Sequence, residues 1–130
     1  MNQILIFTKT PVSLDQTEIK RVANQALETF AIDNAYMEII FVDKDEIREL
    51  NEKHRKINTA TDVLSFPQKE VPVASIKMLG SIVISEEVVL EKEEETPDVV
   101  KHGLLHLLGY DHEKNEAEWQ KQATKIECNL

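Results

Sequence analysis

Four short apolar runs constrain the fold of this sequence more than any other feature. Each is four to seven residues long, rich in β-branched or aromatic residues, and followed by a polar residue or proline. That pattern is typical of strands and is too short for a buried helix. The runs are ILIF near the N-terminus, YMEIIFV (36–42), VLSF (63–66, stopped by Pro67) and LGSIVI (79–84).

Helical segments are predicted between and after these runs. Apolar residues recur every three or four positions in the first of them, and Ser13 with Gln16 fits a capping box at its start. The acidic run Glu91–Glu95 is expected to form a solvated helix face. The predicted helices are Asp15–Phe30, Asp43–Arg55, Ser85–Glu95, Thr96–Gly109 and a last one from about Asn115.

The order of these elements predicts the fold class. Four strands with helices between and after them favour an α+β fold, in which helices cover one small mixed sheet. The opening strand–helix–strand unit favours some parallel pairing. A length of 130 residues fits one domain, residues 1–130, with one core.

Composition and charge exclude several classes of function. No run approaches the roughly 20 apolar residues of a membrane helix, and the N-terminus lacks the features of a signal peptide. Cys128 is the single cysteine, which favours a reducing cytoplasm. A formal net charge of −9 argues against broad attraction to nucleic acids or anionic membranes, so any contact with a polyanion has to be local.

Three of the four histidines lie within HGLLHLLGYDH, residues 102–112. His102 and His106 are four residues apart, which places both rings on one helix face. Gly109 is suited to end the helix in a left-handed conformation and so to turn His112 toward the same point. Three imidazoles with an open fourth position are typical of a catalytic zinc ion, one per chain, although nickel, copper or manganese would also suit these ligands.

The same spacing occurs in zinc metalloproteases, where a glutamate directly after the first histidine is the general base. In this sequence that position is Gly103. The pattern therefore disfavours a zinc peptidase, although it remains an alternative.

Two further segments extend the motif into a family resemblance. NEKHRKINTATDVLSFP and LGSIVIS occur before HGLLHLLGYDH. All three resemble the hallmark segments of the bacterial YbeY family of ribosomal RNA maturation factors, in the same order, and together they cover most of the chain.

The resemblance implies a function. Members of the YbeY family are held to be metal-dependent endoribonucleases specific for single strands, which act in 3′-end maturation of small-subunit ribosomal RNA and in ribosome quality control. It implies zinc ligands at His102, His106 and His112, on a helix of the C-terminal half, and a functional arginine at Arg55. Ribosome-associated protein partners are expected, and DNA is not.

Position alone would make Arg55 a surface residue at a helix end, paired with nearby carbonyls or with Asp62. The sequence also departs from the family pattern twice. Ser81 stands where the family usually has an acidic residue, and the segment between Ser85 and His102 is short. A ribosome-associated factor in which zinc is structural, without catalysis, is the other alternative.

Overall fold

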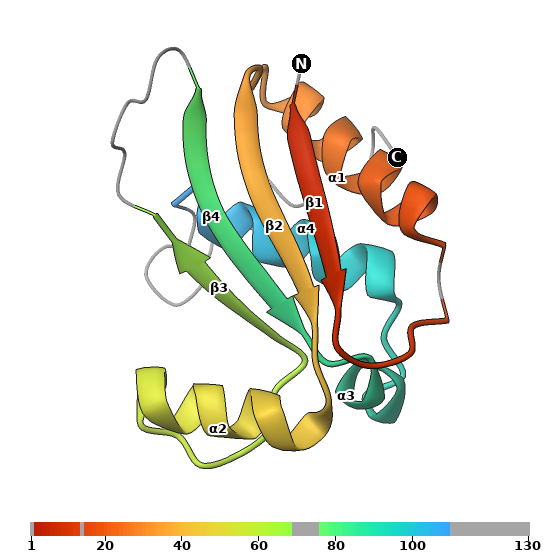
Figure 1. Ribbon diagram of the computed structural model, residues 1–130, viewed down its shortest axis with the longest axis vertical. Helices are drawn as coiled ribbons and strands as arrows, with labels where there is room; N and C mark the ends of the chain where they lie inside the picture. The colour runs from red at the N-terminus through yellow and green to blue at the C-terminus, as the bar shows by residue number, and fades with distance from the viewer. Residues whose placement is uncertain (1, 14, 69–75, 110–130) are drawn as a thin grey trace.

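A computed structural model describes residues 2–13, 15–68 and 76–109 (Figure 1). His112 and the helix predicted from about Asn115 lie outside the described residues. The elements are β1 (Gln3–Thr8), α1 (Gln16–Thr29), β2 (Ala35–Phe41), α2 (Lys44–Arg55), β3 (Val63–Pro67), β4 (Lys77–Ile84), α3 (Glu86–Glu91) and α4 (Thr96–Leu107).

The four strands form one mixed sheet in the order β1-β2-β4-β3. β1 pairs with β2, and β2 with β4, in parallel, while β3 pairs with β4 antiparallel at one edge. The predicted fold class, α+β with a four-stranded mixed sheet and covering helices, is confirmed. β4 begins two residues earlier than the apolar run LGSIVI predicted, because Lys77 and Met78 still pair with β2.

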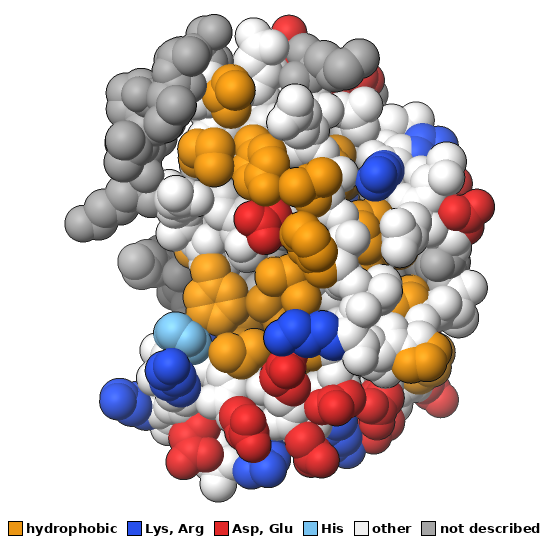
Figure 2. Space-filling view, in the orientation of Figure 1, with side chains coloured by type: hydrophobic (Ala, Val, Ile, Leu, Met, Phe, Trp, Pro, Cys, Tyr) orange, Lys and Arg blue, Asp and Glu red, His pale blue; other side chains and the backbone are white. Residues whose placement is uncertain are grey.

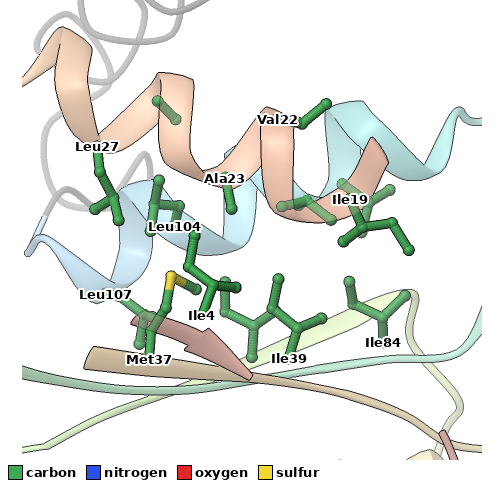
Figure 3. Close-up of a cluster of buried hydrophobic side chains, with 14 of the residues drawn as sticks. Ile4, Ile19, Val22, Ala23, Leu27, Met37, Ile39, Ile84, Leu104 and Leu107 are labelled. Carbon is green, nitrogen blue, oxygen red and sulfur yellow. The ribbon is translucent and has the colours of Figure 1, made fainter. Parts of the chain in front are cut away.

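Helices α1 and α4 cover one face of the sheet (Figures 1 and 3). Their apolar residues form the main core with alternate residues of the strands, including Ile4, Met37, Ile39, Ile82 and Ile84. Helix α2 packs at one end of the opposite face, where Ile47 meets a smaller cluster of buried residues. The sheet therefore has one fully covered face and one partly covered face. Among the described residues, no helix has the length and apolar character needed to cross a membrane.

The start of α1 differs from the sequence prediction. Asp15, not Ser13, is the N-cap, and its carboxylate accepts a hydrogen bond from the backbone N–H of Thr17 at 2.9 Å. Ser13 instead donates its backbone N–H (2.9 Å) and its hydroxyl (3.0 Å) to the carboxylate of Glu86. The capping-box prediction was wrong because a partner far away in the sequence binds the serine.

Helix α2 begins where the sequence predicted, since the Asp43 carboxylate accepts from the backbone N–H of Glu46 at 2.8 Å. It ends at Arg55, because Lys56 adopts a left-handed conformation with φ of 63°. The predicted helical face for the run Glu91–Glu95 was wrong. Helix α3 ends at Glu91, and Glu93 takes a φ of 57° in the turn before α4.

Candidate functional site

Helix α4 carries two of the three predicted metal ligands. It begins at Thr96 with Pro97 in its first turn and ends at Leu107, two residues before the predicted end. His102 and His106 lie one turn apart on it, and both are half-buried. Two imidazoles at this spacing suit a divalent transition metal. Among the residues described, no group of three or more metal-ligating side chains is assembled. His112, the predicted third ligand, lies outside them.

The end of α4 supports the role predicted for Gly109. Its φ of +95° lies in the region that favours glycine, and its N–H donates to the carbonyl of His106 at 3.0 Å. The chain therefore leaves the helix direction directly after the histidine pair.

The leucines around the histidines hold α4 against the sheet. Leu104, Leu105 and Leu107 are buried, and Leu104 and Leu107 point toward Met37 and α1 in Figure 3. Burial of each such side chain contributes about 1.5–3 kcal/mol. The backbone that carries His102 and His106 is therefore fixed by core packing, as a preorganised site requires.

Gly103 lies where α4 packs closely against the sheet. A Cβ atom at this position would lie 2.8 Å from Cγ2 of Ile82 and 3.2 Å from Cγ2 of Val63. The glutamate that serves as general base in metallopeptidases would point into these two strands. The structure thus supplies a packing reason for the glycine, and it argues against the peptidase alternative.

Strand β3 adds a polar contact at the same point. The hydroxyl of Ser65 donates to the backbone carbonyl of Gly103 at 2.9 Å, between the two histidines. The sequence placed Ser65 in the predicted strand VLSF, and no spacing pattern in it indicated this contact. The signal available was a single hydroxyl inside the apolar run VLSF.

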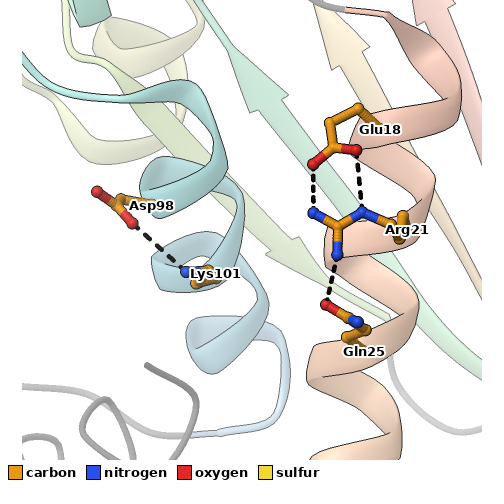
Figure 4. A network of polar contacts seen from close by, with 5 residues as sticks. All are labelled: Glu18, Arg21, Gln25, Asp98 and Lys101. Carbon is orange, nitrogen blue, oxygen red and sulfur yellow. Dashed lines mark hydrogen bonds and ion pairs between the residues drawn. The ribbon is translucent and has the colours of Figure 1, made fainter. Parts of the chain in front are cut away.

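Arg55 is exposed at the last position of α2. Across residues 2–13, 15–68 and 76–109, no ion pair or hydrogen bond engages its guanidinium. The pairing with Asp62 that position alone suggested is not formed, and the ammonium group of Lys92 lies 3.7 Å from that carboxylate. Figure 4 shows the contrast on α1, where Arg21 contacts both Glu18 and Gln25.

β3 is the element that touches both helices of interest. Val63 and Ser65 face α4, whereas Leu64 and Phe66 face the side of α2. The ring of Phe66 meets that of His54 edge-on, with centroids 4.9 Å apart. Strand alternation therefore places α2, which carries Arg55, and α4, which carries His102 and His106, on opposite sides of the edge strand β3.

A carboxyl pair lies where β3 begins. Burial raises the pKa of Glu94, and the neighbouring charge of Asp62 raises it further. Burial alone would also raise the pKa of Asp62, but contacts with Glu94, Lys92 and Thr61 outweigh it and lower that pKa. Asp62 is thus the carboxylate of the pair, and it accepts from the backbone N–H of Val63 at 2.9 Å to fix the start of the strand.

Ser81 lies away from α4, the helix that carries His102 and His106. It pairs with Glu38 of β2 and Phe66 of β3, whereas its neighbour Ile82 faces Gly103. A side chain at this position therefore points to the sheet face opposite α4. The departure at Ser81 leaves the surroundings of His102 and His106 unchanged.

Comparison with known proteins identifies the family. Residues 5–128 match the family model described as Endoribonuclease YbeY. The chain belongs to the YbeY family. The resemblance inferred from the three sequence segments is thereby confirmed.

Relatives in the YbeY family match nearly the whole chain. The Endoribonuclease YbeY of Sulfurimonas denitrificans is 41% identical over 132 residues, covering 94% of this chain and 88% of the relative. That of Aquifex aeolicus is 37% identical, covering 92% and 84%. The solution structure of TM1509 from Thermotoga maritima aligns with a TM-score of 0.54 at 29% identity, covering 98% of this chain and 87% of the other.

Proposed function

We propose that this chain is a metal-dependent endoribonuclease that cleaves single-stranded RNA. Its expected role is 3′-end maturation of small-subunit ribosomal RNA and ribosome quality control, in the cytoplasm. The observation that carries the proposal is the pair His102 and His106 on a packed helix of a YbeY-family chain, with a glycine between them that leaves no room for a peptidase base.

The chain's own residues fit a metal ion. His102, His106 and His112 would hold it, with zinc as the first choice and other divalent transition metals as alternatives. The fit rests on two half-buried imidazoles one turn apart and on the glycine turn that follows them. Such an ion, when bound, supplies Lewis acidity toward a phosphoryl oxygen.

Arg55 is proposed as the catalytic cation. A guanidinium offers several N–H donors in a fork that matches two phosphoryl oxygens. Because this guanidinium is exposed and engages no carboxylate among the described residues, substrate binding requires no existing ion pair to break. Its role is to bind the phosphodiester and to stabilise the charge that develops on its oxygens.

The rest of the surface limits RNA affinity. Lys53 and Lys56 flank Arg55, but they share a shallow depression of about 490 Å³ with Glu49 and Glu52. With a net charge of −9, free RNA should bind weakly and with strong dependence on salt. A ribosome or ribosome-associated protein would supply the remaining affinity.

Cleavage of a single-stranded oligoribonucleotide tests the proposal. We expect Arg55→Ala to lower the rate by about 100-fold or more, as loss of one donor to a developing oxyanion does. Arg21→Ala is the matched control, because Arg21 is a half-exposed arginine that contacts Glu18 on α1. Circular dichroism and metal content show whether each variant is folded and loaded.

The outcomes separate the alternatives. Cleavage by wild type and by Arg21→Ala, but not by Arg55→Ala or His106→Ala, supports the endoribonuclease. Equal cleavage by all four proteins would expose a contaminant. Silence in all four, with loss of folding on chelation, would favour the ribosome-associated factor with structural zinc, and chelator-sensitive cleavage of casein would revive the peptidase.

A further inference from the structure

The partly covered face of the sheet bears an apolar surface that the proposed mechanism does not use. Alternation along the strands turns every second side chain toward it, and α2 covers only the end near Leu64 and Val83. We call the uncovered part the open face. It consists of Leu5, Phe7, Tyr36, Glu38, Met78 and Ser81, with Phe66 at its boundary with α2.

The open face is exposed at β1 and half-buried over the other strands. Leu5 and Phe7 are 40% and 47% exposed on β1, although both are large and apolar. Figure 2 shows hydrophobic side chains gathered over all four strands, with Lys and Arg side chains near the end of α2. Neighbouring exposed apolar side chains that are rimmed by polar residues are typical of binding surfaces.

Aromatic rings are concentrated there. The chain has only four phenylalanines, two tyrosines and one tryptophan. Phe7, Tyr36 and Phe66 all lie on the open face, each from a different strand. His54 adds a further ring against Phe66. A four-stranded sheet with exposed rings is the arrangement on which single-stranded nucleic acid stacks its bases.

Two polar residues, Glu38 and Ser81, lie in the middle of this surface. Strand register sets Leu5, Glu38, Ser81 and Phe66 side by side in one row. The Tyr36 hydroxyl lies 3.4 Å from the Glu38 carboxylate, so both polar groups meet at one point. A carboxylate here repels a phosphate but accepts hydrogen bonds from the amino groups of bases.

Cationic side chains adjoin the aromatic end of the row. Lys53, His54, Arg55 and Lys56 are consecutive and exposed, and this is the longest run of basic residues in the sequence. His54 touches Phe66, so the run begins where the open face ends. Charge complementarity therefore favours phosphates at the end of α2 and bases over the sheet.

From these contacts we infer that the open face binds the bases of single-stranded RNA next to the segment held by Arg55. Phe7, Tyr36 and Phe66 stack the bases. Glu38 accepts from the exocyclic amino group of cytosine, adenine or guanine and disfavours uracil, which presents a carbonyl oxygen instead. This inference rests on the proposed function, because it extends the binding site of the same substrate.

Binding of non-cleavable RNA tests the inference. The probes are labelled 2′-O-methyl oligocytidylate and oligouridylate, measured by fluorescence anisotropy at low ionic strength. We expect wild type to bind oligocytidylate more tightly than oligouridylate. Phe7→Ala should weaken binding of both by about tenfold, since stacking dominates such contacts. Glu38→Gln should bring the two affinities together.

Leu90→Ala is the control variant. Leu90 is the most exposed of the large hydrophobic residues described, at 64%, and lies on α3 away from the open face. Its substitution should leave both affinities unchanged. Ultraviolet cross-linking followed by mass spectrometry should place the labelled peptide on β1 or β2.

Two results would overturn the inference. One is that Phe7→Ala and Glu38→Gln bind both RNAs as tightly as Leu90→Ala does, or that wild type binds neither RNA; the open face would then not be an RNA-binding surface. The other is a rise in both affinities in Glu38→Gln, which would place phosphates beside the carboxylate. Either result leaves the endoribonuclease proposal standing if wild type cleaves RNA and Arg55→Ala does not. If wild type instead shows the expected base preference but does not cleave RNA, only the endoribonuclease proposal is refuted.

Discussion

Gly103→Ala is the smallest change that probes how the histidine helix is held. The new methyl group would lie 2.8 Å from Cγ2 and 3.2 Å from Cδ1 of Ile82. Ile82 is fully buried and β-branched, so its χ1 cannot rotate away freely. Helix α4 or strand β4 has to move by some tenths of an ångström.

The change in the free energy of unfolding follows from three contributions, of which two lower it and one raises it. Overpacking a well-filled core costs about 1–3 kcal/mol. Replacing glycine by alanine inside a helix gains about 1 kcal/mol. Movement of α4 also stretches the 2.9 Å hydrogen bond from Ser65, which contributes about 1 kcal/mol. We expect a net loss of about 1–3 kcal/mol in the free energy of unfolding.

Urea denaturation measures this loss, and a double-mutant cycle identifies its cause. Ile82→Ala removes the atoms in the way and alone should cost about 2–5 kcal/mol. In the Ile82→Ala background, Gly103→Ala should lose its penalty, because the methyl group then fills space. A Gly103→Ala protein stabilised by about 1 kcal/mol would refute the reasoning, since helix propensity would then outweigh contact with the sheet.

Two further predictions concern the strand between the helices. Ser65→Ala should lower the free energy of unfolding by about 1 kcal/mol, and Ser65→Thr, which keeps a hydroxyl, should lower it by less. Urea denaturation measures both losses, and equal losses would show that the hydroxyl contact to Gly103 is unimportant. Glu94 has a pKa raised by burial and by Asp62, so the stability it contributes is complete below its ordinary value of 4.5 and is lost as pH rises through the folded pKa. Glu94→Gln should therefore be more stable than wild type at pH 7, by at most about 1 kcal/mol, and as stable as wild type near pH 4. Thermal unfolding of both proteins at both pH values measures the difference in stability, and a difference that does not change with pH would contradict the prediction.

Sequence determined the elements because their signals are local. Runs of β-branched residues and the signals that start helices act over a few residues, and the strands and the helices beginning near Asp43 and at Thr96 appeared where they were predicted. The spacing of His102 and His106 also fixed their shared helix face. The predicted third ligand, His112, lies outside the described residues and stays a prediction, as does the metal.

Tertiary structure decided what depends on partners far away in the sequence. Ser13 bonds to Glu86 instead of capping a helix, and Asp62 meets Lys92 and Glu94 instead of Arg55. Gly103 is required because Ile82 and Val63 pack closely against it, and the spacing of residues in the sequence does not reveal this contact. Local propensity selects helix or strand, but only packing decides which side chains meet across the sheet, because strand order and register bring distant segments together.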